Sequence, residues 1–260
     1  MSTDSIDLKA RVSHESYPQS KIAICGDGEE FIRLGNKKFY RHELMTAFGG
    51  TLNPDRYAQY PVHQFGNAAA LGLAGYSLTT FVLGLYYTGV LGIVVPNVVI
   101  GLAMFYGGTI MFLSGTWELV IGNAFAGTVL TSYGCFWFSF GSIYIEAFGI
   151  SAAYADEPEQ LQNAIGFYLI GWLIFTFLMT LLTVKSTVLF FSLFVSLNVL
   201  FSVLAAANFT GSASASKAGG IVAIVASILG WFNTFAGVAT KQNSYFTANP
   251  IPIPIFGKTE

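Results

Sequence analysis

The sequence predicts an all-α integral membrane protein whose membrane part is a bundle of six transmembrane helices. Hydrophobic residues make up 53% of the 260 residues and charged residues only 10%, whereas a soluble domain carries roughly 25% charged residues. Between about residues 65 and 240 the chain is almost continuously apolar and divides into six blocks. Because a helix needs about 20 apolar residues to cross a bilayer, each block is long enough for one span.

Segments that contain glycine, proline, asparagine or charge separate the six blocks. The first block, residues 68–87, carries no charge and opens the membrane region. Lengths near 20 residues favour helices over the short alternating strands of a membrane barrel. The other five expected spans are residues 98–121, 125–148, 164–184, 188–207 and 218–239.

The membrane domain is expected to cover residues 65–240, between two cytosolic tails. Residues 1–64 are polar and carry glycine, proline and charge throughout. They are predicted to be a largely flexible N-terminal tail, with residues 31–34 and 39–48 as candidates for short ordered pieces. Residues 241–260 form the expected C-terminal tail.

The distribution of positive charge predicts that both termini face the cytosol. Eight of the twelve lysines and arginines precede the first span. With six spans and a cytosolic N-terminus, eleven of the twelve lie on the cytosolic side and only Lys217 lies outside, as the positive-inside rule requires. The acidic segment 156–159 is then outside, together with the glycosylation sequon 208–210, whose use the sequence leaves open.

Glu118 is the only carboxylate expected deep in a span with an interior position. It lies three residues after Gly115 and four before Gly122, so it shares the small-residue face along which helices pack. Charged residues within spans are functional candidates. With the neighbouring Asn123, Glu118 is a candidate for proton transfer or gating at a pore mouth. The alternative is that Glu118 has only a structural role, as an acid that accepts hydrogen bonds.

The sequence argues against an enzyme and against a bound metal or cofactor. All three histidines precede the membrane domain, so no imidazole is available within the spans for catalysis, haem or metal. No span contains a lysine or arginine, nor a nucleophile–base pair. The expected partners are the lipid bilayer and a small solute, and no nucleic acid.

Several ordered motifs give the chain a family resemblance. It resembles the acetate uptake transporter family, which includes bacterial succinate–acetate permeases and fungal acetate transporters, and the long N-terminal tail and the final motif are similar to the fungal branch. The resemblance covers roughly residues 65–250 and is carried by Asn67–Leu73, Thr79–Thr80, Phe105–Gly108, Thr131–Gly134, Gly166–Tyr168 and Lys241–Tyr245.

The resemblance implies a plasma-membrane homohexamer in which each six-helix subunit contains its own pore. It also implies a hydrophobic constriction made by an aromatic residue in span one, a tyrosine in span three and a leucine in span five. These positions fall on Tyr76, Tyr133 and Leu197. Many relatives have phenylalanine where this chain has Tyr76.

One departure from the family pattern lies at the start of the first span. The family reads Asn-Pro-Ala-Pro-Leu-Gly-Leu, whereas both prolines are alanines here, Ala68 and Ala70. Alanine restores two backbone N–H groups that proline lacks.

The predicted function is transmembrane passage of acetate and other small monocarboxylates, either through a channel or coupled to a proton. Asn67, Thr79 and Thr80 are candidate substrate-binding residues, because amides and hydroxyls can replace part of the water that an anion loses. Two alternatives stay open. One is a membrane acetate sensor or signalling scaffold with little transport, and the other is export of ammonium or ammonia.

Overall fold

The computed structural model describes residues 22–47, 65–93 and 95–254. The chain divides into two compact units, Met1–Phe65 and Gly66–Glu260. Each unit has its own elements and its own contacts.

The first unit contains a small antiparallel sheet followed by one short helix. Strands β1 (Ile22–Cys25), β2 (Phe31–Leu34) and β3 (Lys37–Tyr40) pair in the order β1-β2-β3, and α2 (Arg41–Ala47) follows directly. Gly35 has a φ of +61° in the two-residue turn between β2 and β3, a conformation that glycine adopts without strain.

The sheet refines the expectation of a flexible N-terminal tail. Strand β2 coincides with the predicted ordered piece at residues 31–34, and the piece at 39–48 is divided between β3 and α2. The sheet as a whole was not predicted. The rest of the predicted flexible tail, residues 1–21 and 48–64, lies outside the described residues.

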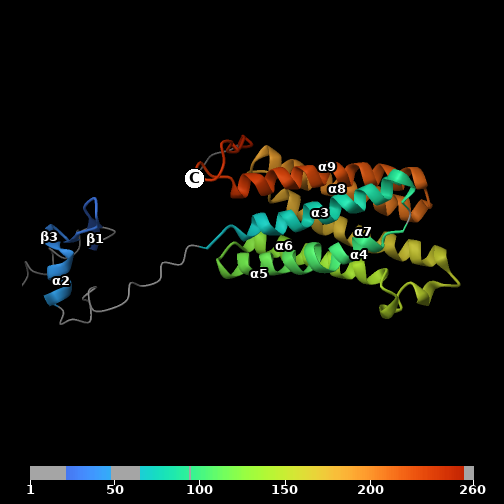
Figure 1. Cartoon of the computed structure of the whole chain (residues 1–260), viewed down its shortest axis with the longest axis horizontal. Coiled ribbons are helices and arrows are strands. Elements are labelled where there is room, and N and C mark those ends of the chain that lie inside the picture. The colour runs from blue at the N-terminus through green and yellow to red at the C-terminus, as the bar shows by residue number, and fades with distance from the viewer. Residues whose placement is uncertain (1–21, 48–64, 94, 255–260) are drawn as a thin grey trace, which may run out of the picture. The chain divides into compact units, whose positions relative to one another are not determined.

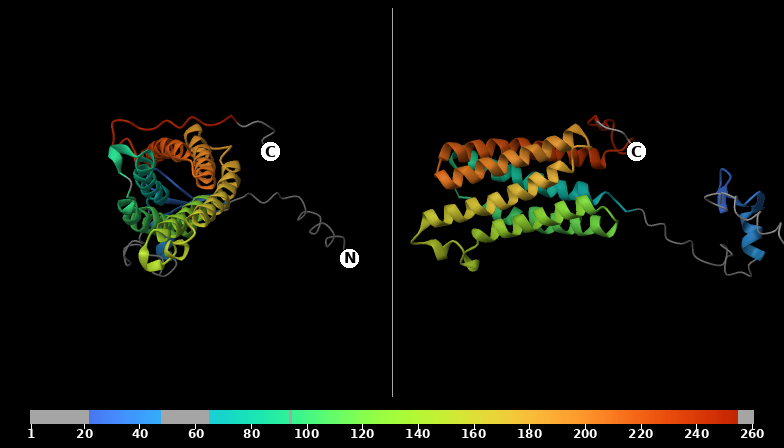
Figure 2. Two further views of the ribbon diagram at one scale, coloured as in Figure 1. Left: turned by 90° about the vertical axis from the view of Figure 1, so that its right-hand side faces the viewer. Right: turned by 180° about the vertical axis from the view of Figure 1, so that it is seen from behind.

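The second unit is a bundle of long helices that lie side by side with their axes aligned (Figure 1). Seen end-on, the helices surround a common centre (Figure 2). Helix α3 packs against α9 and α5, α5 packs against α6, and α8 packs against both α7 and α9. The helices are α3 (Ala68–Thr88), α4 (Asn97–Met104), the π-helical η3 (Phe105–Ile110), α5 (Met111–Val120), α6 (Ala124–Ile143), α7 (Pro158–Leu181), α8 (Val188–Thr210) and α9 (Ala213–Val238).

Among the described residues, five helical segments are long and apolar enough to cross a membrane: α3, the continuous segment Asn97–Val120, α7, α8 and α9. Helix α6 has 20 residues but contains three glycines, three serines and two threonines, so it falls outside this set. Half of its residues are buried. A helix that is surrounded by other helices needs less apolar surface toward lipid, which accounts for its composition.

The predicted second span is continuous but not a regular α-helix. The six residues of η3 form a π-helical turn, and the Thr109 hydroxyl donates to the carbonyl of Met104 at 2.8 Å, five residues earlier. A Cβ on Gly107 would lie 2.8 Å from Thr79 Oγ1 and 2.9 Å from the Trp137 ring. Glycine therefore lets this turn lie directly against α3 and α6.

Three predicted boundaries were wrong, among them the start of the sixth span, which was expected at residue 218 although α9 begins at Ala213. The third span was expected to reach residue 148, but α6 ends at Ile143 and a separate 3-10 turn, η4 (Glu146–Phe148), follows. The fourth was expected to begin at residue 164, but α7 begins at Pro158, where proline suits the first helical position because its missing N–H would have no partner there.

Small residues bring helices α3 and α9 into close contact. A Cβ on Gly84 would lie 2.8 Å from the carbonyl oxygen of Gly220, and a Cβ on Gly220 would lie 2.7 Å from that of Gly84. Helices α3 and α9 therefore touch backbone to backbone at this crossing. Such contacts allow the dispersion interactions by which helices associate in lipid.

Candidate functional site

A cavity lies between α3, α5, α6 and α8. Tyr76 from α3, Tyr133 from α6 and Leu197 from α8 all line it. Every other side chain of its wall is apolar, including the buried Met111 and Phe194. The structure thus brings together three residues that are far apart in the sequence.

Helical periodicity explains why these residues reach the same cavity. On α3, α6 and α8 the lining residues recur at intervals of three and four positions, some of them with an adjacent neighbour, which places them along one stripe. The stripes are Ala69, Leu73 and Tyr76 on α3, then Phe125, Ala126, Val129, Leu130 and Tyr133 on α6, and Phe190, Leu193, Phe194 and Leu197 on α8.

The Tyr133 hydroxyl is held by a neighbouring helix. It lies 2.7 Å from Thr176 Oγ1 on α7. The Thr176 hydroxyl donates its own proton to the carbonyl of Trp172 at 2.7 Å, so Tyr133 is the donor in the bond between them. The proton of the Tyr133 hydroxyl is therefore already engaged in a hydrogen bond within the protein.

The polar contacts continue along α7 beyond Thr176. The Thr180 hydroxyl donates to the Thr176 carbonyl at 2.7 Å and accepts from the Asn198 amide on α8 at 2.6 Å. Sequence reasoning missed Thr176 and Thr180 as members of the site. Two threonines four residues apart in an apolar helix were the available signal.

Tyr76 differs from Tyr133 in its hydrogen bonding. Its ring lines the cavity, yet its hydroxyl is buried in the wall and has no hydrogen-bond partner. The hydroxyl of Thr80, one turn along α3, lies near the Tyr76 hydroxyl without reaching hydrogen-bonding geometry, and it likewise has no other partner. Among the described residues that line this cavity, Tyr76 alone has a buried side-chain polar atom without a partner.

Thr79 and Thr80, two predicted substrate-binding residues, do not line this cavity. The Thr79 hydroxyl donates to the carbonyl of Gly75 at 2.8 Å, and its side chain packs against Gly107 of the π-helical turn. Thr80 is 1% exposed. Thr79 therefore stabilises the contact between α3 and η3, whereas Thr80 keeps a buried hydroxyl without a partner.

Asn67 caps the start of α3 and ties it to the end of α9. Its side-chain oxygen accepts from the Ala70 backbone N–H at 3.3 Å, and its amide donates to the Gly237 carbonyl at 3.0 Å. The first bond requires an N–H at position 70, which proline would not supply. The alanine at this position thus gives Asn67 a capping role.

Glu118 joins the starts of two helices. One carboxylate oxygen accepts from the Ala69 N–H of α3 at 2.8 Å, and the other accepts from the Asn123 amide at 2.6 Å. Asn123 in turn caps α6 by accepting from the Ala126 N–H at 3.2 Å. Glu118 is 2% exposed, and the positive ends of both helix dipoles favour a carboxylate there.

These bonds lie at one end of the cavity. Ala69 and Ala126, whose N–H groups are held by Glu118 and Asn123, both line the cavity wall. Glu118 and Asn123 therefore fix two sides of its rim. We call the group of Asn67, Glu118 and Asn123 the rim cluster.

Apolar helices around a cavity with largely apolar walls define a multi-pass helical membrane protein. The chain belongs to the GPR1/FUN34/yaaH family, whose sequence profile matches residues 48–255. The resemblance recognised from the sequence motifs is thereby confirmed.

Relatives whose names indicate different functions are similar to this chain. It is 49% identical over 246 residues to Ammonia transport outward protein 2 of Saccharomyces cerevisiae, covering 95% of this chain and 86% of that protein. It is 37% identical over 226 residues to Acetate permease A of Emericella nidulans, covering 83% and 75%. The solved structure of the bacterial acetate channel SatP matches with a TM-score of 0.63 and 30% identity, covering 69% of this chain and 96% of that one.

Proposed function

We propose that this protein passes acetate and other small monocarboxylates across a membrane through the cavity lined by Tyr76, Tyr133 and Leu197. The observation that carries the proposal is the meeting of these three residues at one apolar cavity whose wall holds a single unpartnered hydroxyl. The likeness to an acetate permease and to an acetate channel supports the same solute.

The composition of the wall suits a solute that must leave again. A carboxylate stripped of water in an apolar cavity is strongly destabilised unless it finds hydrogen bonds. Tyr76 can donate one, whereas no lysine or arginine lines the cavity to hold the anion tightly. Passage requires binding that is favourable enough to admit the solute and weak enough to release it.

The three lining residues act as the size filter in this proposal. Tyr76, Tyr133 and Leu197 are all at least nine-tenths buried, so the space between them is bounded by closely packed neighbours. Tyr133 is fixed by Thr176 and forms a rigid side. Leu197 contributes bulk without polarity, so it excludes longer acids by size alone.

The rim cluster supports the proposed position of the pathway's cytosolic mouth. Asn67 holds α3 to α9, while Glu118 and Asn123 hold α3 to α6. We assign to Glu118 the role of a rim clamp that opens when it is protonated. A protonated carboxyl offers one acceptor fewer to the two donors that face it.

Six spans with both termini in the cytosol fit the proposal. The Asn67–Gly237 bond brings the start of α3 and the end of α9 to the same end of the bundle, which requires an even number of crossings between them. Five segments qualify by length and apolarity, so α6 is the proposed sixth. A homohexamer with one pore per subunit and a plasma-membrane location follow from the family resemblance.

Uptake of radiolabelled acetate into liposomes that contain the purified protein tests the proposal. Uptake above that of empty liposomes, and inhibited by propionate, is the expected result. Binding of acetate without uptake would instead identify a sensor, and absence of both would refute the proposal.

Ammonia export is a second candidate, and the 49% identity to a protein named for outward ammonia transport favours it. The same liposomes can be loaded with ammonium chloride and monitored with an internal pH dye. A protein-dependent change in internal pH that acetate neither inhibits nor mimics would support export of ammonia over transport of carboxylates.

A further inference from the structure

The end of the described chain is bound to the loop between α7 and α8. The Val188 N–H donates to the Ile251 carbonyl at 2.9 Å, and the Ile253 N–H donates to the Ser186 carbonyl at 3.0 Å. Val188 is the first residue of α8, where backbone N–H groups have no acceptor within the helix. The tail therefore supplies an acceptor that the start of α8 needs. We call residues 251–253 the tail strap.

The sequence around the tail strap suits this pairing. Prolines stand at every second position, Pro250, Pro252 and Pro254, and Pro252 forms an antiparallel bridge with Thr187. Successive N–H groups of an extended chain point to opposite edges, and proline has no N–H. Only the isoleucines can therefore donate toward the loop, and the outer edge offers no N–H to another chain.

The family motif at residues 241–245 anchors the other end of the tail. The Asn243 amide donates to the Val238 carbonyl at 3.0 Å, and its side-chain oxygen accepts from the Thr240 N–H at 2.8 Å. Asn243 thereby closes a turn directly after α9. In the end-on view of Figure 2, the red chain that follows α9 extends across the width of the bundle. The tail thus links the end of α9 to the start of α8.

The tail strap acts on the cavity through Thr187. The Thr187 hydroxyl caps α8 by accepting from the Phe190 N–H at 3.2 Å. The Phe190 ring lines the cavity and meets the Phe125 ring edge-on, with the ring centroids 6.1 Å apart. Phe125 is the second residue of α6 and Phe190 the third of α8, so both rings lie at the end of the cavity next to the rim cluster. We call them the mouth pair.

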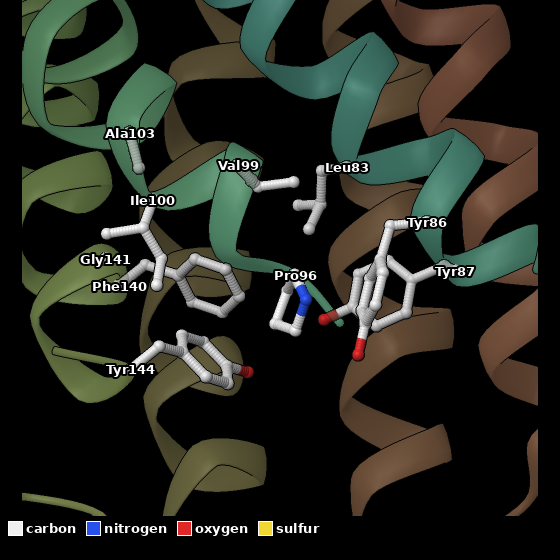
Figure 3. Close-up of a pocket in the computed structure, with 10 residues that line it drawn as sticks. All are labelled: Leu83, Tyr86, Tyr87, Pro96, Val99, Ile100, Ala103, Phe140, Gly141 and Tyr144. Carbon is white, nitrogen blue, oxygen red and sulfur yellow. The ribbon is translucent and has the colours of Figure 1, made fainter. Parts of the chain in front are cut away.

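The opposite end of the bundle is closed without a tail. There a second, smaller cavity is lined by Tyr86 and Tyr87 of α3 and by Phe140 and Tyr144 of α6, on either side of Pro96 (Figure 3). The aromatic side chains at that end are carried and positioned by the helices themselves. At the rim end, the first turn of α8 is instead held by a segment outside the helices.

The tail strap is held by few buried contacts. Ile251 is 69% exposed, and Phe246, which lies between α9 and the strap in the sequence, is 79% exposed. Segments with few buried apolar contacts open at a much lower free energy than the whole protein. The strap can therefore be released while the helices stay folded.

We propose that the tail strap fixes the start of α8 and so holds the mouth pair in place, which limits the size of the solute that enters the cavity. The proposal rests on the function proposed above. When the strap is released, the cap at Thr187 loosens and Phe190 moves away from Phe125. The mouth widens, and longer monocarboxylates enter more readily. The strap is thus a positioning segment for specificity that does not itself contact the solute.

The reaction of a cysteine inside the cavity with a charged thiol reagent tests the strap without any flux measurement. Leu193 lines the cavity one turn beyond Phe190 and is 1% exposed. The parent variant carries Leu193→Cys together with Cys25→Ser and Cys135→Ser, so that a single thiol remains. Its rate of reaction with methanethiosulfonate ethylsulfonate in the full-length protein reports access through the mouth.

Two proline-related variants of this parent form a matched pair. Ile253→Pro removes the N–H that bonds to Ser186, and the reaction rate is expected to rise about fivefold, the change that loss of one hydrogen bond makes to an opening equilibrium. Pro252→Ala adds an N–H that points away from the loop, so the rate is expected to stay unchanged. A stop codon after Ala248 removes the strap and is expected to raise the rate at least as much as Ile253→Pro. Equal rates in all these variants would overturn the strap.

Flux measurements separate this proposal from the proposed function. In liposomes, uptake of butyrate relative to acetate is expected to rise by a similar factor in Ile253→Pro and to stay unchanged in Pro252→Ala. An unchanged ratio in Ile253→Pro, with acetate flux intact, would overturn the role of the strap in specificity and leave transport standing. Absence of acetate flux in the wild type would refute transport, whereas a difference in cysteine reaction rates would still show that the strap holds the mouth pair.

Discussion

The rim cluster and the cavity wall differ in how completely their polar side chains are hydrogen-bonded. In the rim cluster, Asn67, Glu118 and Asn123 all bond to backbone groups or to each other. In the cavity wall, Tyr133 is bonded but Tyr76 is not. Polar residues of the bundle therefore divide into those whose hydrogen bonds hold helices together and those whose hydroxyls are left without a partner.

The largest expected effect is a loss of stability when the hydrogen bonds of the rim cluster are broken. Replacing Glu118 with glutamine puts an amide donor against either the Ala69 N–H or the Asn123 amide, two groups that are themselves donors. A buried donor without an acceptor costs about 1–3 kcal/mol. The free energy of unfolding in denaturant titrations of the Glu118→Gln variant is therefore expected to fall by about this amount.

A second substitution supplies the control. In the double variant Glu118→Gln, Asn123→Asp, the glutamine oxygen accepts from Ala69 while its amide donates to the new aspartate, which can still cap α6. Stability is expected to return most of the way to the wild-type value. Additive losses in the double variant would show that Glu118 and Asn123 do not form a coupled pair.

The Glu118→Gln variant also separates a titrating role of Glu118 from a purely structural one. With no titratable group at position 118, the pH dependence of acetate uptake is lost if protonation of Glu118 opens the rim or if Glu118 carries the proton. A protein in which Glu118 is only a structural hydrogen-bonding acid keeps that pH dependence. Uptake measured between pH 4 and pH 7 in wild type and Glu118→Gln makes the distinction, whereas the aspartate of the double variant would itself titrate.

The size filter predicts a change in selectivity of about tenfold, the effect expected when a small apolar group is removed from a binding surface. Replacing Leu197 with alanine enlarges the cavity beside Tyr76 and Tyr133. Uptake of lactate relative to acetate is expected to rise by this factor. Leu113→Ala, on an exposed position of α5 that lines neither cavity, is the control. Unchanged selectivity in Leu197→Ala would remove this residue from the filter.

The smallest expected effect concerns the start of α3. Replacing Ala70 with proline removes the N–H that bonds to Asn67 but leaves the Asn67–Gly237 bond possible. Loss of an N-cap bond costs about 1 kcal/mol. Ala68→Pro is the matched control, because proline is tolerated at the first helical position. A larger loss of stability in Ala68→Pro than in Ala70→Pro would contradict the capping role of Asn67.

Much of the bundle could be predicted because apolar length and helical periodicity are local properties. The start of α3 at Ala68 and the start of α8 at Val188 agree with the sequence expectations. The α6 boundary failed because its last predicted residues are aromatic and apolar but form a separate 3-10 turn. The small sheet of residues 22–40 was missed because its short strands are interspersed with charge, which hides their alternation.

The site was harder to predict, because hydrogen-bond partners depend on which helices face each other. Tyr76, Tyr133 and Leu197 were named from family motifs, and the fold brings them to one cavity. Thr79 was named as a substrate-binding residue, but its hydroxyl is bonded within its own helix. Thr176 was missed because only the packing of α7 against α6 shows that it holds Tyr133.

The central claim is that the Tyr76 hydroxyl serves the solute while the Tyr133 hydroxyl serves the fold. The direct test compares Tyr76→Phe with Tyr133→Phe in acetate flux and in stability. Tyr76→Phe is expected to raise the half-saturating acetate concentration about fivefold with no loss of stability, the size expected for one hydrogen bond. Tyr133→Phe is expected to lower stability by about 1 kcal/mol. Unchanged half-saturation in Tyr76→Phe, together with a loss of its stability, would contradict the claim.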